Sequence, residues 1–491
     1  MTAPQLTPTA AFERALDARD VRFDGVFFVG ITTTGIYCRP VCPARVSDTR
    51  RRRFFASAAA AERAGFRPCL RCRPELAPGR AACDAVSRLA HTAARRIAAG
   101  ALNGRSVADL ARELAVSERH LRRALEREVG AGPLDLARTH RLLLAKRLLA
   151  DTTLSVTRIA YASGFQSLRR FNSAFREQYR MPPSAMRRPR AQGGAGDDAP
   201  LRLTLAYRPP FAWEALLASF WEDAVDGVEV VLGRRYGRTV RLDGCSGVVF
   251  AAHEQARGCV TVDISSSLVP ALMPLLARLR HLFDLDAEPA AIDAHLAESG
   301  LGPLVARRPG LRLPGAVDGF EVALRELLGG WTRTIVHALG EPIETGTPAL
   351  GRLMPDAACV AGAGEDGLAA LGVRRERARA LAQIARLVAD GSLRLEPGSD
   401  PAATHRLLAE VPGVGDRSAT AIVLRALSWP DAFDPSDPGL LERAERWRPW
   451  RAYAAMHLRL ADTVPAPRIV HSIGQSGPAR SWPPATSSRS A

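Results

Sequence analysis

The chain has 491 residues, 47% hydrophobic and 24% charged, which is typical of folded globular protein and too long for one core. Its net charge of +16 is uneven: residues 1–190 carry 35 Arg and Lys against 16 Asp and Glu, giving +19, and the remaining 32 and 35 give −3. The first part is therefore predicted to bind a polyanion, namely double-stranded DNA. No membrane-length apolar run or secretory signal is found, so we expect no membrane partner and a cytoplasmic location.

Residues 1–80 contain two close cysteine pairs, in GIYCRPVCPAR and RPCLRCRP. The pairs are Cys38 with Cys42 and Cys69 with Cys72, separated by 26 residues, a spacing typical of one Zn²⁺ bound by four sulfurs. Because the thiols of a cytoplasmic protein stay reduced, metal binding is favoured over disulfides. The remaining cysteines, Cys83, Cys245, Cys259 and Cys359, are expected to be buried apolar residues.

Arginines crowd the same segment. They are Arg39, Arg45, Arg51, Arg52, Arg53, Arg67, Arg71 and Arg73. A general preference for arginine over lysine explains why Lys146 is the only lysine of the chain. It does not explain why residues 1–190 have too few aspartates and glutamates to balance their arginines, while the rest of the chain has enough. Zinc keeps a sulfur deprotonated, and a thiolate is the nucleophilic form. A methylated phosphate of DNA is a neutral electrophile that such a sulfur could attack. The alternative is a purely structural zinc.

The stretches FFVGITTTGIYCRPVCPAR and AGFRPCLRCRPE resemble the N-terminal domain of the Ada adaptive-response proteins over about residues 12–76. In that family the cysteine matching Cys38 irreversibly accepts a methyl group from a DNA methylphosphotriester. The other zinc ligands match Cys42, Cys69 and Cys72. The positions that contact the DNA backbone match Thr34, Arg45 and Arg67. Methylation turns one thiolate into a thioether and changes the formal charge of the site from about −2 to about −1, so DNA binding should strengthen.

Residues 84–188 contain two helix-turn-helix patterns. The first starts at Ser106, a predicted N-cap, and the second follows Leu154 after the connecting helix LDLARTHRLLLAKRLLA. The side chains expected to face DNA are Arg119, His120, Arg122, Arg123, Gln166, Ser167, Arg169 and Arg170. A plain helical bundle is the alternative. The tandem units resemble the AraC-type DNA-binding domain, which implies promoter binding, transcriptional activation and RNA polymerase as a partner.

The composition after this block predicts a linker over residues 189–200, in RRPRAQGGAGDDAP. Residues 201–285 open with the strand-like LRLTLAY and contain the β-branched runs VEVVLG and GCVTVDIS, which predict a mixed α/β domain. Residues 290–462 have the pattern of helices, and the tail 463–491 is expected to be disordered.

The segment LLAEVPGVGDRSATAIVLRAL predicts a helix-hairpin-helix, in which Gly413 and Gly415 let backbone amides point at a phosphate. Asp437 follows in DAFDPSDPGLL. With LRLPGAVDGFEVALRELLGG and LRLTLAYRPPFAWEALLASFW, this order resembles the 3-methyladenine glycosylase II branch of the helix-hairpin-helix superfamily over residues 201–462. There the aspartate matching Asp437 drives cleavage of the N-glycosidic bond of a flipped base. An ordinary loop acid or helix cap is the alternative.

The sequence departs from that branch where the family has aromatic residues. The run 416–418 replaces a tryptophan, Ile422 replaces a tyrosine, and the helix after LLG is short; the candidates to replace them are Trp331, Trp447 and Trp450. The alternative function is therefore a methylation-sensing regulator with an inactive glycosylase domain. No Pro-Cys-His-Arg string exists, so O6-methylguanine repair is not predicted.

The predicted fold class is multidomain α+β. It consists of a small zinc domain, an all-α tandem helix-turn-helix domain, a mixed α/β domain and an α-helical helix-hairpin-helix glycosylase domain.

Overall fold

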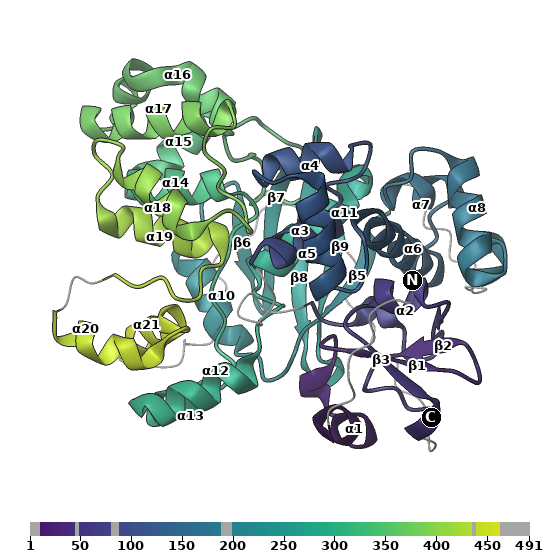
Figure 1. Cartoon of the computed structure of the whole chain (residues 1–491). Helices are drawn as coiled ribbons and strands as arrows, with labels where there is room; N and C mark the ends of the chain where they lie inside the picture. Colours follow the sequence, from purple (N-terminus) through teal and green to yellow (C-terminus); the bar gives the residue numbers. More distant parts are fainter. Residues whose placement is uncertain (1–9, 45–48, 80–87, 188–198, 435–437, 462–491) are drawn as a thin grey trace.

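The computed structural model describes residues 10–44, 49–79, 88–187, 199–434 and 438–461 (Figure 1). It confirms the multidomain α+β architecture: a small sheet domain, a helical block, an α/β domain and a helical C-terminal half follow one another along the chain. Five features named above lie wholly or mostly outside these ranges: Arg45, Cys83, the linker 189–200, Asp437 and the tail 463–491. Among the helices of the described ranges, none has the length and apolarity of a membrane span.

The N-terminal domain is a four-stranded sheet with the strand order β3-β1-β2-β4. Its strands are β1 (Phe28–Ile31), β2 (Ile36–Cys38), β3 (Arg52–Phe55) and β4 (Arg67–Pro68). Helices α1 (Ala10–Asp17) and α2 (Ala58–Arg63) and the short turns η1 (Val21–Phe23), η2 (Thr49–Arg51) and η3 (Pro74–Leu76) complete it. Clustered phenylalanine rings, including Phe12, Phe27 and Phe54, fill one side of the sheet. Only β2 and β4 run parallel, so both strands end at the same edge.

The helical block consists of seven helices: α3 (Arg88–Ala98), α4 (Val107–Glu113), α5 (Glu118–Glu128), α6 (Pro133–Asp151), α7 (Val156–Ala162), α8 (Leu168–Tyr179) and α9 (Pro183–Met186). Four of them begin at a serine whose hydroxyl accepts a backbone hydrogen bond, which satisfies one of the free amides of the first turn. These caps are Ser106, Ser117, Ser155 and Ser167. The two helix-turn-helix units are α4–α5 and α7–α8, joined by α6.

The α/β domain is an antiparallel sheet with the strand order β5-β9-β8-β7-β6. Its elements are β5 (Leu201–Ala206), α10 (Trp213–Glu222), β6 (Glu229–Leu232), β7 (Arg235–Leu242), β8 (Cys245–Glu254), η4 (Gln255–Arg257), β9 (Cys259–Ile264), η5 (Ser266–Ala271) and α11 (Leu272–Leu282). Strands β5, β6 and β9 match the predicted runs, whereas β7 and β8 are additional. The expectation for the lone cysteines holds for Cys259, which is buried, and is wrong for Cys359, which is exposed.

The C-terminal half is helical. It contains α12 (Pro289–Leu296), η6 (Ala297–Leu301), α13 (Gly302–Arg307), α14 (Gly319–Leu328), η7 (Gly329–Trp331), α15 (Thr332–Leu339), α16 (Ala357–Ala370), α17 (Arg375–Ala389), α18 (Pro401–Ala409), α19 (Asp416–Leu427), α20 (Pro438–Ala444), η8 (Glu445–Trp447) and α21 (Arg451–Arg459). Helices α14, α17 and α19 share one hydrophobic core, and a second, smaller core joins α12 to α21.

The second helix-turn-helix unit and the α/β domain share one hydrophobic core. That core runs from Leu142 on α6 through Phe171 and Phe175 on α8 to the sheet residues Leu203 and Val262. Helix α7 packs against η5, and α3 packs against α11. The first unit, α4–α5, has a separate core with α3. The helical block and the α/β domain are thus joined by packing as well as by sequence (Figure 1).

Candidate metal centre and nucleic-acid interfaces

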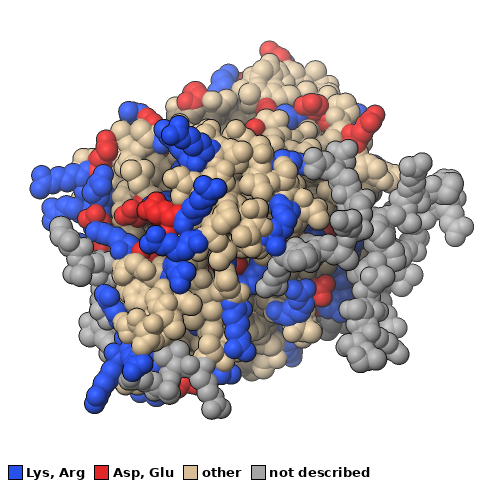
Figure 2. Space-filling model, turned by 90° about the vertical axis from the view of Figure 1, so that its right-hand side faces the viewer, with Lys and Arg blue, Asp and Glu red and all other residues tan. Residues whose placement is uncertain are grey.

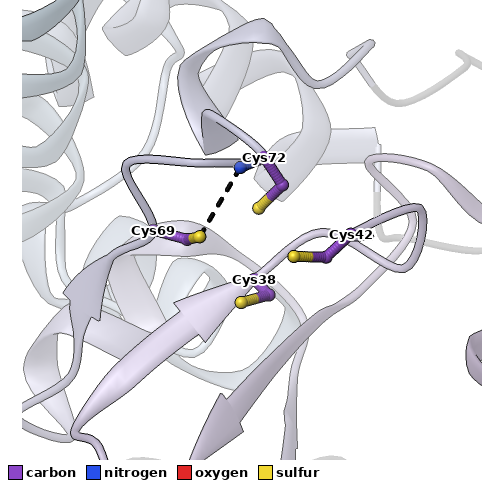
Figure 3. A group of neighbouring side chains, drawn as sticks. All are labelled: Cys38, Cys42, Cys69 and Cys72. Carbon is purple, nitrogen blue, oxygen red and sulfur yellow. Dashed lines mark hydrogen bonds between the residues drawn. The ribbon is translucent and has the colours of Figure 1, made fainter. Parts of the chain in front are cut away.

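The four predicted cysteines meet at one edge of the small sheet. Cys38 is the last residue of β2 and Cys69 directly follows β4, and because these strands are parallel their carboxyl ends lie together. Cys42 and Cys72 lie in the turns that follow. The four sulfur atoms lie within 4.8 Å of one another and point toward a common centre (Figure 3). All four residues are buried, with at most 8% exposure.

The chemistry of these sulfurs fits one zinc ion. Backbone amides donate to two of them: Arg39 N to Cys72 Sγ (3.4 Å), and Arg71 N and Cys72 N to Cys69 Sγ (3.3 and 3.5 Å). Hydrogen bonding with the neighbouring thiols, Cys42 first, together with burial raises the pKa of Cys38. Four crowded thiols cannot all ionise without a cation among them, and four converging soft donors are what tetrahedral Zn²⁺ requires.

Three of the surrounding arginines are engaged in structural ion pairs. Arg39 pairs with Asp24, Arg52 with Glu13 and Asp17, and Arg73 with Asp151 and Glu75. These side chains are at most about one-fifth exposed; Arg39 and Arg52 pair within the domain, and Arg73 also links it to α6. Only the exposed arginines of the cluster, which include Arg67 and Arg71, are therefore placed to contact DNA.

Two of the expected backbone-contact residues lie on the surface near the cysteines. Thr34 is exposed, and its Oγ1 donates weakly to Ile31 O at 3.4 Å. Arg67 is exposed on β4, where it is the register partner of Ile36 on β2. Arg45 lies outside the described residues. Figure 2 shows the side of the molecule that carries this sheet with α7 and α8, and Arg and Lys side chains project from much of it.

Helices α5 and α8 expose most of the side chains predicted to face DNA. On α5, Leu121 and Leu125 point into the core, which leaves the opposite side exposed: Arg119, His120, Arg122 and Arg123. In the second unit the exposed residues are Gln166, Arg169 and Arg170. Ser167 is only half-exposed, and its Oγ accepts from Arg170 N at 3.2 Å, so this hydroxyl caps α8. The display of charge on two second helices is what groove binding requires.

The hairpin between α18 and α19 has the predicted glycine geometry. Gly413 has φ +89°, and a Cβ there would lie 3.3 Å from Ala380 and Glu376. Gly415 is exposed and precedes the first residue of α19, and a Cβ at this position would meet no atom within 4 Å. A phosphate could therefore approach the amides of this turn.

Asp437 lies outside the described residues, but its neighbours are seen. Asp434, three residues before it, pairs with Arg417 of α19 at 3.5 Å. Of the tryptophans expected to replace the missing aromatic residues, Trp447 is 1% exposed and belongs to the core. Trp450 is half-buried with its ring against His295. Trp331 is 46% exposed and covers Gly372, so its ring is the most accessible of the three.

The sequence analysis missed residues where the domains meet. Arg95 of α3 lines a cavity together with His281 and Asp284, at the end of the α/β domain, and Tyr453 of α21. Burial raises the pKa of Asp284 to about 6, and Tyr453 donates to it at 2.6 Å. Lys146 of α6 contacts the second cysteine pair. Its status as the only lysine was a visible signal, but nothing in the sequence indicated its partner.

Three family models match successive parts of the chain. They are "Metal binding domain of Ada" at residues 11–75, "Helix-turn-helix domain" at residues 110–189 and "AlkA N-terminal domain" at residues 202–318. The chain is 36% identical over 502 residues to the "Probable bifunctional transcriptional activator/DNA repair enzyme AlkA" of Mycobacterium tuberculosis strain H37Rv, covering 96% of this chain and 97% of that protein.

Two proteins of Escherichia coli K12 are similar to separate parts. "DNA-3-methyladenine glycosylase 2" is 32% identical over 276 residues, which cover 52% of this chain and 95% of that protein. "Bifunctional transcriptional activator/DNA repair enzyme Ada" is 52% identical over 60 residues, which cover 12% of this chain and 17% of that protein.

Proposed function

The chain belongs to the family of bifunctional Ada- and AlkA-type transcriptional activators and DNA-repair enzymes, and on that premise we propose three linked activities. It takes methyl groups from DNA methylphosphotriesters onto Cys38, activates transcription of alkylation-repair genes, and excises alkylated bases of the 3-methyladenine type. The convergence of the four buried cysteines beside exposed arginines is the observation that carries this proposal.

In the methyl transfer, the Cys38 sulfur attacks the methyl carbon of the triester. An S–C bond forms, the C–O bond breaks, and its electron pair stays on the phosphate oxygen, which becomes an ordinary charged diester. Cys38, Cys42, Cys69 and Cys72 would hold the zinc, which keeps the sulfurs deprotonated at neutral pH. Amide donation to Cys69 and Cys72 withdraws electron density from those two sulfurs and makes them weaker nucleophiles. Between the other two, the match to the Ada family selects Cys38.

The methylated protein then acts as a regulator. Loss of one negative charge beside the phosphates strengthens DNA binding, with Thr34 and Arg67 on the backbone and α5 and α8 in successive major grooves. RNA polymerase is the expected partner at the promoter, and the cytoplasm is the expected location, because reduced thiols and chromosomal DNA occur together there in bacteria. The test is mass spectrometry after exposure to methylated duplex DNA, which should find one added methyl on Cys38 and none on a Cys38→Ser variant.

In base excision, the hairpin amides at Gly413 and Gly415 hold a phosphate while the damaged nucleotide is flipped. The N-glycosidic bond breaks, its electron pair leaves with the cationic base, and the base departs neutral. Asp437 stabilises the positive charge that develops on the deoxyribose. A water oxygen then bonds to C1′ and releases its proton to solvent.

A second candidate function is regulation without base excision, and the burial of Trp447 favours it because one of the three expected stacking partners is unavailable. Single-turnover release of 3-methyladenine from methylated duplex DNA separates the two candidates. Release that collapses in Asp437→Asn supports excision. Equal absence of release in both proteins, with methyl uptake on Cys38 intact, supports the regulator.

A further inference from the structure

A buried lysine of the helical block reaches into the zinc domain. Lys146 lies on α6 and is 3% exposed. Its Nζ donates to the carbonyl oxygen of Cys69 at 3.3 Å and to Oε2 of Glu75 at 2.5 Å. An ammonium group buried without partners would be strongly unfavourable, so these contacts fix the side chain. Helix α6 therefore holds the loop that carries the second cysteine pair.

The contact continues as an alternating chain of charges to the end of α6. The Glu75 carboxylate, 2% exposed, also pairs with Arg73 at 3.0 Å. Arg73 in turn pairs with Asp151, the last residue of α6, at 2.7 Å. The chain of contacts thus crosses twice between α6 and the segment that directly follows the cysteine loop. It runs through Lys146, Glu75, Arg73 and Asp151. We name these four residues the α6 clamp.

The other end of the same loop, at Cys72, is held within the zinc domain. The Arg39 guanidinium donates to Cys72 O at 3.1 Å and pairs with Asp24. The loop from Cys69 to Cys72 is therefore held between two cations, one from its own domain and one from α6. Any change in the net charge of the sulfur centre alters its attraction to both cations, and buried charges respond strongly because they are little screened.

Helix α6 leads directly to the second DNA-binding unit. Asp151 is followed at Ser155 by the N-cap of α7, and α6 packs against α7. We infer that Lys146 is the positioning residue through which the methylation state of Cys38 reaches the α7–α8 unit, because the α6 clamp ties the cysteine loop to the helix that holds this unit. This inference rests on the proposed methyl acceptance and methylation-dependent DNA binding.

The neighbouring residue provides a matched control. Arg147 is also buried on α6, with 6% exposure, but its guanidinium donates to Thr204 O of β5 in the α/β domain. Arg147→Met therefore removes a buried cation of the same helix without touching the cysteine loop. Lys146→Met removes the cation that contacts the loop, and Lys146→Arg keeps the charge.

The experiment uses the full chain and two readouts. Methyl uptake on Cys38 is measured by mass spectrometry. The Kd is then measured before and after uptake, for a duplex selected from a random-sequence pool by the methylated wild-type protein. For the wild type we expect methylation to lower Kd by a factor within the usual range of allosteric coupling, roughly 5- to 150-fold. In Lys146→Met the factor should fall toward one with uptake unchanged, whereas Lys146→Arg and Arg147→Met should keep the wild-type factor.

The outcomes separate this inference from the function on which it rests. If Lys146→Met takes up methyl and shows the full wild-type factor, the inference is wrong and the proposed function stands. If the wild type itself takes up methyl without a change in Kd, the proposed signalling fails and the inference fails with it. Should Lys146→Met lose methyl uptake because Glu75 is left buried with a single partner, the double variant Lys146→Met/Glu75→Gln removes both charges. If methylation lowers the Kd of this double variant by the full wild-type factor, the inference is wrong; a factor near one supports it.

Discussion

The shared core predicts that the second helix-turn-helix unit and the α/β domain unfold as one cooperative unit. Ile159 tests this because it is 0% exposed on α7, the helix that packs against η5. Ile159→Ala removes three carbon atoms from that core, and large-to-small substitutions of this type cost about 2–5 kcal/mol. A value of about 3 kcal/mol, divided by 1.4 kcal/mol per factor of ten, gives a roughly 100-fold rise in the opening equilibrium.

Native-state hydrogen exchange measures that opening for each element. In Ile159→Ala the slowest amides of α7 and α8 and those of β5 and β9 should lose protection by the same factor. The matched control is Leu110→Ala, since Leu110 is 1% exposed in the separate core of α3–α5 and should affect that unit first. Loss of protection confined to α7 and α8, with β5 and β9 unchanged, would refute a common unit.

Three further predictions follow from single sites. Removing zinc with a chelator should abolish methyl uptake on Cys38 and lower the melting temperature of the N-terminal domain, which calorimetry would detect. Burial raises the pKa of the Glu62 carboxyl from 4.5 to about 7, so the folded chain binds this proton more tightly than the unfolded chain. The resulting contribution to the free energy of unfolding is complete below pH 4.5 and is lost as the pH rises through 7. Glu62→Gln should flatten this part of the stability–pH curve, as measured by urea unfolding. Arg238→Met leaves Glu321 buried without its 2.8 Å partner and should lower the free energy of unfolding by about 3–5 kcal/mol. Adding Glu321→Gln should recover part of that loss, and no recovery would argue that the pair does not stabilise the fold.

The metal centre was predictable because its signal is local. Each cysteine pair lies in one turn, and the spacing alone indicates two ligands on each side of an ion. Ser106 was equally visible as a cap from its place before an apolar pattern, whereas Ser167, which caps α8, was predicted to face DNA. Both features depend on residues within a few positions of one another, which is the range over which a single sequence is informative.

Strand β7 shows why other parts were missed. Its sequence RYGRTVRL contains an arginine at every third position, which interrupts the apolar alternation expected of a strand. Each arginine has a distant acidic partner in the folded chain: Arg235 pairs with Asp263, Arg238 with Glu321 and Arg241 with Asp356. The sequence cannot show that these charges are compensated, so the strand was not predicted.

The same limit applies to the arginines around the cysteines. From the sequence, Arg52 and Arg67 are equivalent members of a basic cluster. In the fold, Arg52 is 8% exposed between Glu13 and Asp17, whereas Arg67 is exposed on β4. Net charge therefore indicated the class of partner correctly, but the residues able to contact it are selected by ion pairs that only the tertiary structure reveals.

Helix α6 contacts both the cysteine loop and the α/β domain. Lys146 contacts the cysteine loop and Arg147, the next residue, contacts β5. Because β5 belongs to the core that also holds α7 and α8, the position of these two helices depends on packing against the α/β domain as well as on α6. The α/β domain therefore supports the second helix-turn-helix unit whether or not the chain excises bases. This role explains how a regulator with an inactive glycosylase domain would still require that domain for its fold.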